Sequence, residues 1–120
     1  MRADPRGAKT VVIVDDESDI RDTLRDAFED EGYAVATAAN GEEALGLLRN
    51  IRRPCAVIID IIMPVMRGSE LYSVLRADPA LADIPVVVST SDPSRAPAGV
   101  LIMRKPIDLD RLIAAVAALF

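Results

Sequence analysis

Four short runs rich in Val and Ile, together with a weakly alternating segment at residues 33–38, are spaced along the chain and limit its possible folds more than any other feature. A continuous apolar run of this length predicts a strand buried on both faces, as in a parallel sheet. Segments with helical spacing of apolar residues separate most of the runs, and this alternation predicts a single α/β domain. The five predicted strands are residues 10–14, 33–38, 55–60, 84–90 and 100–103.

The segments between the runs carry helix start and stop signals. We expect the first helix to be capped by Asp16 or Ser18 and to end at Gly32. The second helix is expected to begin after Asn40, and the last after Asp108.

One connection between the predicted strands is too short for a helix. Only nine residues, 91 to 99, separate the fourth strand from the fifth. A parallel connection that contains a helix usually needs about 10–12 residues or more. Pro93, Pro97 and Gly99 also oppose a helix here. We therefore expect a loop, or at most one helical turn, in place of the fourth helix.

Size and charge exclude several classes of protein. With 120 residues, the chain is expected to form one domain over residues 9–120, preceded by a flexible tail at 1–8. The net charge of −5 argues against direct nucleic-acid binding. No apolar stretch approaches the ~18 residues of a membrane span, and the start does not resemble a secretory signal. The end at Phe120 fits either a stand-alone domain or part of a larger protein.

The chain has no histidine, so a Ser-His-Asp or Cys-His catalytic group cannot form. Its single cysteine, Cys55, lies in a predicted buried strand and is expected to be a small apolar core residue. This cysteine usage fits a reducing cytoplasm. Any chemistry must therefore use carboxylate, lysine or hydroxyl groups, with or without a hard metal ion.

Reactive side chains stand at the carboxyl ends of four predicted strands. Asp15 and Asp16 follow the first, Asp60 ends the third, Thr90 ends the fourth and Lys105 follows the fifth. Open α/β sheets place their ligand sites at this edge. If the first and third strands are neighbours, three carboxylates meet there, which is too costly without a cation.

Each of these residues also has a simpler interpretation. Paired acids after a strand can merely favour a helix N-terminus, which is how we interpret Glu17 and Asp19. Lys105 could be a solvated lysine, and Ser89 or Ser91 could supply the hydroxyl in place of Thr90.

The ordered set of motifs resembles the receiver domains of bacterial two-component response regulators, including the chemotaxis regulators. The resemblance covers essentially the whole chain from Val11 to Phe120. It rests on Val14-Asp15-Asp16-Glu17, Asp60-Ile-Ile-Met63-Pro64 followed by Gly68, Pro85-Val-Val-Val-Ser-Thr90, and Lys105-Pro106.

The resemblance implies a doubly wound, flavodoxin-like parallel sheet of order 2-1-3-4-5, here with the fourth helix missing or reduced to a loop. It implies a phosphoacceptor that takes its phosphoryl group from a histidine kinase or phosphotransfer protein and signals to a downstream protein. Asp60 would be the phosphoacceptor, Thr90 and Lys105 would bind phosphoryl oxygens, and Mg²⁺ would be held by Asp15, Asp16, Asp60 and the backbone carbonyl of Ile62. The Lys105–Pro106 bond would be cis.

Two features depart from the family pattern. The fourth helix is absent from the face through which receivers usually dimerise or meet targets. At Ile102, three residues before Lys105, the family often carries a Tyr or Phe that moves with the Thr90 position. We therefore expect an atypical output face, with partners binding elsewhere, for example at the first helix.

Two other functions compete with the phosphoacceptor. The first is a pseudo-receiver that binds partner proteins without phosphorylation. The second is a Mg²⁺-dependent phosphatase, but such enzymes generally need an acid two residues after the nucleophile, where this chain has Ile62. A flavin or nucleotide site is disfavoured because the first strand–helix turn is acidic and lacks glycine. We expect the chain not to be an enzyme.

Overall fold

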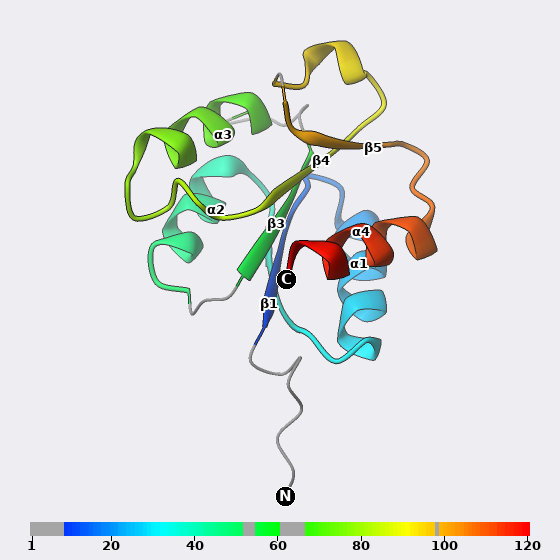
Figure 1. Ribbon diagram of the computed structural model, residues 1–120. Coiled ribbons are helices and arrows are strands. Elements are labelled where there is room, and N and C mark those ends of the chain that lie inside the picture. Colours follow the sequence, from blue (N-terminus) through cyan, green and yellow to red (C-terminus); the bar gives the residue numbers. More distant parts are fainter. Residues whose placement is uncertain (1–8, 52–54, 61–66, 98) are drawn as a thin grey trace, which may run out of the picture.

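The computed structural model describes residues 9–51, 55–60, 67–97 and 99–120. They form a five-stranded parallel sheet of order β2-β1-β3-β4-β5, with helices on both faces (Figure 1). The predicted fold class and strand order are confirmed. The strands are β1 Thr10–Val14, β2 Ala34–Ala38, β3 Cys55–Asp60, β4 Val86–Thr90 and β5 Leu101–Arg104.

Two apolar layers hold the helices against the sheet, because successive side chains of each strand point to opposite faces. Helices α2 and α3 lie over one face, and α1 and α4 over the other (Figure 1). Within β1, Val12 and Val14 pack into the first layer, whereas Val11 and Ile13 pack into the second. The helices are α1 Ser18–Asp30, α2 Gly41–Leu48, α3 Gly68–Ala77 and α4 Leu109–Leu119.

The predicted caps of α1 are wrong at its start. Neither Asp16 nor Ser18 is the N-cap; Glu17 takes that position and makes no side-chain cap bond. Instead, the Oδ1 atom of Asp15 accepts a hydrogen bond of 2.9 Å from the Glu17 N–H. The acceptor near this helix start thus comes from the residue that follows β1.

The other predicted helix signals are confirmed. Gly32 follows α1 with a φ of 94°, a conformation that glycine adopts without a Cβ penalty. The Asn40 side chain accepts from the Glu43 N–H at the start of α2. The Asp108 side chain accepts from the Arg111 N–H at the start of α4. These caps fix where the helices begin relative to the strand ends.

Among the described residues of the connection between β4 and β5, the one helical element is a 3₁₀ turn, η2, at Pro93–Arg95. This confirms the prediction that the fourth helix is reduced to at most one turn. Ala96 and Val100 are partly buried against the first apolar layer. Strand β5 is the last strand in the sheet order and therefore an edge strand, and Leu101 at its start is 44% exposed.

Some of the sequence predictions fall outside the described residues. The tail at 1–8, the motif residues Met63 and Pro64, and the side chain of Cys55 belong to this group. In the part of the chain that is described, no helix combines the length and apolarity needed to cross a membrane.

Candidate functional site

The buried polar side chains of the described residues gather at the carboxyl ends of three central strands. Asp15 follows β1, Asp60 ends β3, and Ser89 and Thr90 end β4; each is at most 5% exposed. Val14 of β1 pairs with Ile59 of β3, and Asp60 pairs with Ser89 of β4. The parallel register therefore places Asp15 beside Asp60, and Asp60 beside Ser89.

The three predicted acids converge. One carboxylate oxygen from each of Asp15, Asp16 and Asp60 lies within 4.8 Å of the other two. Two oxygens across a Mg²⁺ ion are separated by ~4.2 Å, because each Mg–O bond measures ~2.0–2.1 Å. The donor set is all oxygen, which is what Mg²⁺ prefers, so the residues present fit this ion. The fourth predicted donor, the Ile62 carbonyl, lies outside the described residues.

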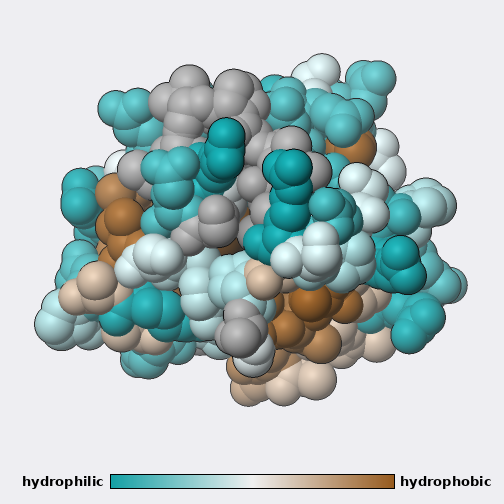
Figure 2. Space-filling model, turned by 90° about the horizontal axis from the view of Figure 1, so that it is seen from above, coloured by the Kyte–Doolittle hydropathy of each residue, from teal (hydrophilic) through white to brown (hydrophobic). Residues whose placement is uncertain are grey.

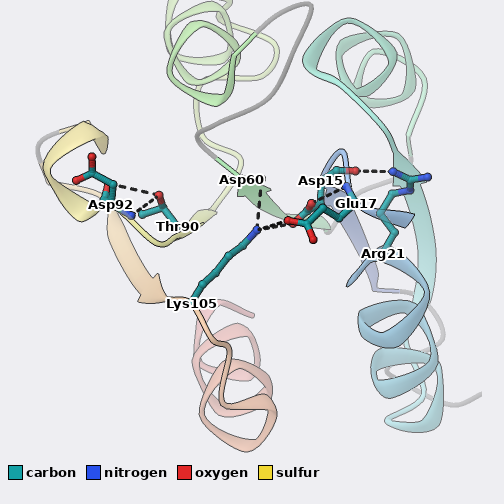
Figure 3. Close-up of polar contacts among 7 residues, drawn as sticks. All are labelled: Asp15, Glu17, Arg21, Asp60, Thr90, Asp92 and Lys105. Atoms are coloured by element: carbon teal, nitrogen blue, oxygen red, sulfur yellow. Dashed lines mark hydrogen bonds and ion pairs between the residues drawn. The ribbon is translucent and has the colours of Figure 1, made fainter. Parts of the chain in front are cut away.

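Lys105 lies between the two buried acids (Figure 3). Its Nζ atom is 3.1 Å from Oδ2 of Asp15 and 3.4 Å from Oδ2 of Asp60. The exposed Glu17 carboxylate is at 4.0 Å from the same atom. The Lys105 side chain is only 15% exposed, so solvent screens these interactions weakly. One ammonium group thus offsets part of the repulsion between two buried carboxylates.

The pKa of Lys105 is raised above its ordinary value of 10.5. Burial alone lowers this pKa, but the hydrogen bond and charge of Asp15, followed by those of Asp60, outweigh it. The lysine is therefore charged at neutral pH. Because the folded pKa is the higher one, its contribution to stability is complete below the ordinary lysine pKa and is lost as the pH rises through the folded value.

The loop that carries Asp15 is held by two further hydrogen bonds. The Asp15 carboxylate accepts from the Glu17 N–H, and the Asp15 carbonyl accepts from Nη1 of Arg21 at 2.7 Å. Arg21 was not among the predicted site residues, and Glu17 was assigned only a helix-end charge. The sequence offered no distinguishing signal for Arg21, since Arg25 follows one turn later on the same helix.

Thr90 is buried, but its hydroxyl does not face the acids. Oγ1 accepts a bond of 3.1 Å from the Asp92 N–H and lies 3.4 Å from the Asp92 carbonyl. In Figure 3 the Thr90 side chain accordingly turns toward Asp92, to one side of the Lys105 contacts. The structure thus brings together four of the predicted side chains and leaves Thr90 engaged with its own loop.

Ser89 presents the other hydroxyl at this edge. Register partners on neighbouring parallel strands point to the same face, so Ser89 shares the face of Asp60. Its Oγ atom is buried and makes no hydrogen bond among the described residues. The alternative of Ser89 as the site hydroxyl therefore stays open. Ser91, the other alternative, is exposed.

The surface around the site is mostly hydrophilic. Figure 2, which views the carboxyl edge of the sheet, shows polar side chains over much of this face. A cavity of about 350 Å³ adjoins Lys105, between α1 and the connection from β5 to α4. Ile20 and Leu24 of α1 and Ile107 line it together with Lys105. The Lys105–Pro106 bond in this connection is cis, as the resemblance implies.

Comparison with known families gives the class of protein that this fold and site define. The family model described as "Response regulator receiver domain" matches residues 11–117. The chain belongs to this family, the receiver domains of two-component response regulators. Members of the family interact with histidine kinases or phosphotransfer proteins.

Curated relatives are longer than this chain. Response regulator MprA of Mycobacterium sp. (strain KMS) is 38% identical over 81 residues, which cover 68% of this chain and 34% of that protein. A response regulator receiver protein of Anaeromyxobacter sp. (strain Fw109-5) is 36% identical over 107 residues, 85% of this chain and 44% of that protein. The chain therefore spans between a third and a half of the length of these two relatives.

Solved structures match nearly end to end. Response regulator protein TrrA from Thermotoga maritima, in complex with Mg²⁺-BeF, superposes with a TM-score of 0.79 at 30% identity, covering 93% of this chain and 99% of that one. Chemotaxis protein CheY4 of Vibrio cholerae gives a TM-score of 0.83 at 28% identity, with 93% and 98% coverage.

We predict that Lys105→Met destabilises the fold, because it leaves Asp15 and Asp60 buried beside each other without their cation. Breaking a buried charge pair costs ~3–5 kcal/mol, and we expect ~2–3 kcal/mol because water still reaches Lys105. Urea unfolding at pH 7 and low ionic strength, without divalent ions, measures the loss.

Lys9→Met is the matched control, since Lys9 is the only other lysine of the chain. Its Nζ atom lies 5.3 Å from the centre of the Phe120 ring, a contact for which we expect a loss of ~0.5–1 kcal/mol. Equal losses for the two variants would show that Lys105 does not neutralise the acids.

Proposed function

We propose that this receiver domain accepts a phosphoryl group on Asp60. The observation that carries the proposal is the placement of the Lys105 ammonium between Asp15 and Asp60 in a buried acidic cluster. Such a cluster is costly to maintain for stability alone, because two buried carboxylates share one lysine. In this role the chain is a phosphoacceptor for a partner protein and not an enzyme that turns over a substrate.

The chemistry follows from the groups at hand. An Asp60 oxygen attacks the phosphorus of a phosphohistidine on a histidine kinase or phosphotransfer protein. The new P–O bond forms as the P–N bond breaks, and the electron pair of that bond stays with the imidazole. Lys105 then exchanges its contact with Asp60 for one with a phosphoryl oxygen, which stabilises the charge of the transferred group.

Asp15, Asp16 and Asp60 would hold Mg²⁺ beside the phosphoryl group. When bound, this ion supplies positive charge that neutralises phosphoryl oxygens. The Glu17 N–H and the Arg21 guanidinium keep Asp15 in place from both ends of the residue, so its carboxylate is preorganised for this role. Asp16 is exposed and is therefore the acid that can adjust its position at least cost.

The phosphodonor protein would dock beside α1. The cavity between α1 and the β5–α4 connection opens next to Lys105 and is lined mainly by apolar side chains. An apolar surface at this position supports docking of a partner whose phosphohistidine must reach Asp60.

We assign the signalling movement to Thr90. A phosphoryl group adds roughly −1.5 to −2 charge beside the end of β4. That charge attracts the Thr90 hydroxyl, which must then leave its contacts with Asp92. Because the Asp92 side chain caps η2, this exchange would loosen the start of the short connection. Ile102 stands where the family often carries a Tyr or Phe and lacks an aromatic ring that could follow the movement, so we assign the output to η2.

A phosphorylation-independent interaction module is the second candidate function. The reduced fourth crossover favours it, because the usual output face is changed while the fold is kept. The two functions differ in one measurable property, covalent modification of Asp60.

We predict that acetyl phosphate with Mg²⁺ adds one phosphoryl group to the protein, detected by intact mass spectrometry. Asp60→Asn removes the nucleophile and should abolish the added mass. Glu17→Gln is the control, because it alters a nearby exposed acid that is outside the proposed metal set. Absence of the added mass in the wild type, under conditions that modify another receiver, would favour the interaction module.

We also predict that phosphorylation shifts the backbone amide NMR signals of Asp92 and Ser94. The shift should persist in Thr90→Ser, which keeps the hydroxyl, and disappear in Thr90→Ala although Asp60 is still modified. Ser89→Ala should behave as the wild type. If Ser89→Ala alone abolishes the shift, Ser89 rather than Thr90 is the signalling hydroxyl.

A further inference from the structure

Strand β5 leaves one side of its backbone open. The Lys105 N–H donates to the Thr90 carbonyl, and Thr90 pairs with Arg104 in the parallel register. In a parallel ladder, alternate residues bond to the same neighbour, so Ile102 and Arg104 direct their N–H and C=O groups away from β4. Within the described ranges, no further strand lies on that side. Among the residues that the structure describes, the main-chain donors and acceptors of this edge therefore pair with no other strand.

This edge is basic in a chain whose net charge is −5. A groove of about 540 Å³ follows β5 to the start of α4, and Arg104 and Arg111 supply its available positive charge. Lys105 also lines it, but its ammonium group contacts Asp15 and Asp60. Its one acid, Asp108, already accepts the Arg111 N–H as the cap of α4. Arg104 and Arg111 are exposed, so their guanidinium groups are accessible to a partner.

The opposite edge of the sheet makes a useful comparison. Strand β2 is also an edge strand, and its Val35 and Thr37 face outward by the same alternation. The groove beside β2 is lined by Glu43 and, among the described residues, by no basic side chain. An acidic partner would therefore distinguish the two edges by charge.

The short η2 connection improves access to β5. Among its described residues, the crossover that leads into β5 has a single 3₁₀ turn, η2. The helix next to β5 is α4, which packs on the sheet face of the second apolar layer. An added strand next to β5 would therefore meet a helix on one face only. Leu101, exposed at the start of the strand, and Ile102, partly exposed, provide apolar contacts along the same edge.

We propose that the β5 edge binds an extended acidic segment of a partner protein as a sixth strand. Main-chain hydrogen bonds to Ile102 and Arg104 supply affinity, and carboxylates that pair with Arg104 and Arg111 supply specificity. A charged residue on a short edge strand is also a common protection against unwanted pairing. That protection needs only Arg104, whereas the second arginine comes from a different element and lines the same groove.

The test uses unphosphorylated protein, so its result is independent of the role of Asp60. The probe is a fluorescein-labelled peptide of eight alternating Glu and Val residues, followed by fluorescence anisotropy at low salt. Arg104→Glu and Arg111→Glu should each weaken binding about tenfold, because each places like charges together. Arg25→Glu changes the net charge equally at a partly exposed position on α1 and should alter binding by less than about twofold.

Two further measurements separate strand pairing from charge attraction. The same peptide with every second amide N-methylated should lose binding, and the bound peptide should slow hydrogen exchange at Ile102 and Arg104 but not at Val35 and Thr37. Circular dichroism checks that each variant is folded. Absence of peptide binding, equal weakening by Arg25→Glu, or unchanged exchange at Ile102 and Arg104 would each overturn the proposal.

Discussion

The contact of one ammonium group with two buried carboxylates is the interaction on which this structure depends. Asp15 and Asp60 lie beside each other because β1 and β3 pair in register. Their two negative charges therefore repel. Lys105 follows the edge strand β5, and its ammonium group contacts both carboxylates. A lysine shared by two acids leaves negative charge uncompensated, and the exposed Asp16 adds more. In the function that we propose, a divalent cation offsets this negative charge and a phosphoryl group contacts the same lysine.

The rest of the fold positions these groups. Parallel register brings the strand ends to one edge, and the two apolar layers fix the strands that carry them. The loop after β1 is held by Arg21 and by the Glu17 N–H, so Asp15 belongs to the rigid part of the site. We assign the movement to Thr90 because its hydroxyl is held, among the described residues, by Asp92 of its own loop. That loop leads directly into the short η2 connection.

Much of this could be predicted from the sequence, because Val and Ile runs that end in polar residues specify both the strands and the edge where they meet. The fourth strand was predicted to begin at residue 84 but starts at Val86; the Pro85 carbonyl still bonds to β3, which blurs that boundary. The predicted N-cap of α1 failed because the acceptor comes from Asp15, a tertiary arrangement that local cap preferences do not describe. Arg21 and the direction of the Thr90 hydroxyl depend on side-chain geometry and left no pattern in the sequence.

Mg²⁺ binding tests the convergence of the three acids most directly. Isothermal titration calorimetry of the unphosphorylated protein should detect one Mg²⁺ site in the millimolar range or tighter, lost in a variant that combines Asp15→Asn with Asp16→Asn. Lys105→Met, which removes the competing cation, should bind Mg²⁺ more tightly than the wild type. No heat of Mg²⁺ binding in the wild type, or equal binding in the double asparagine variant, would contradict the account.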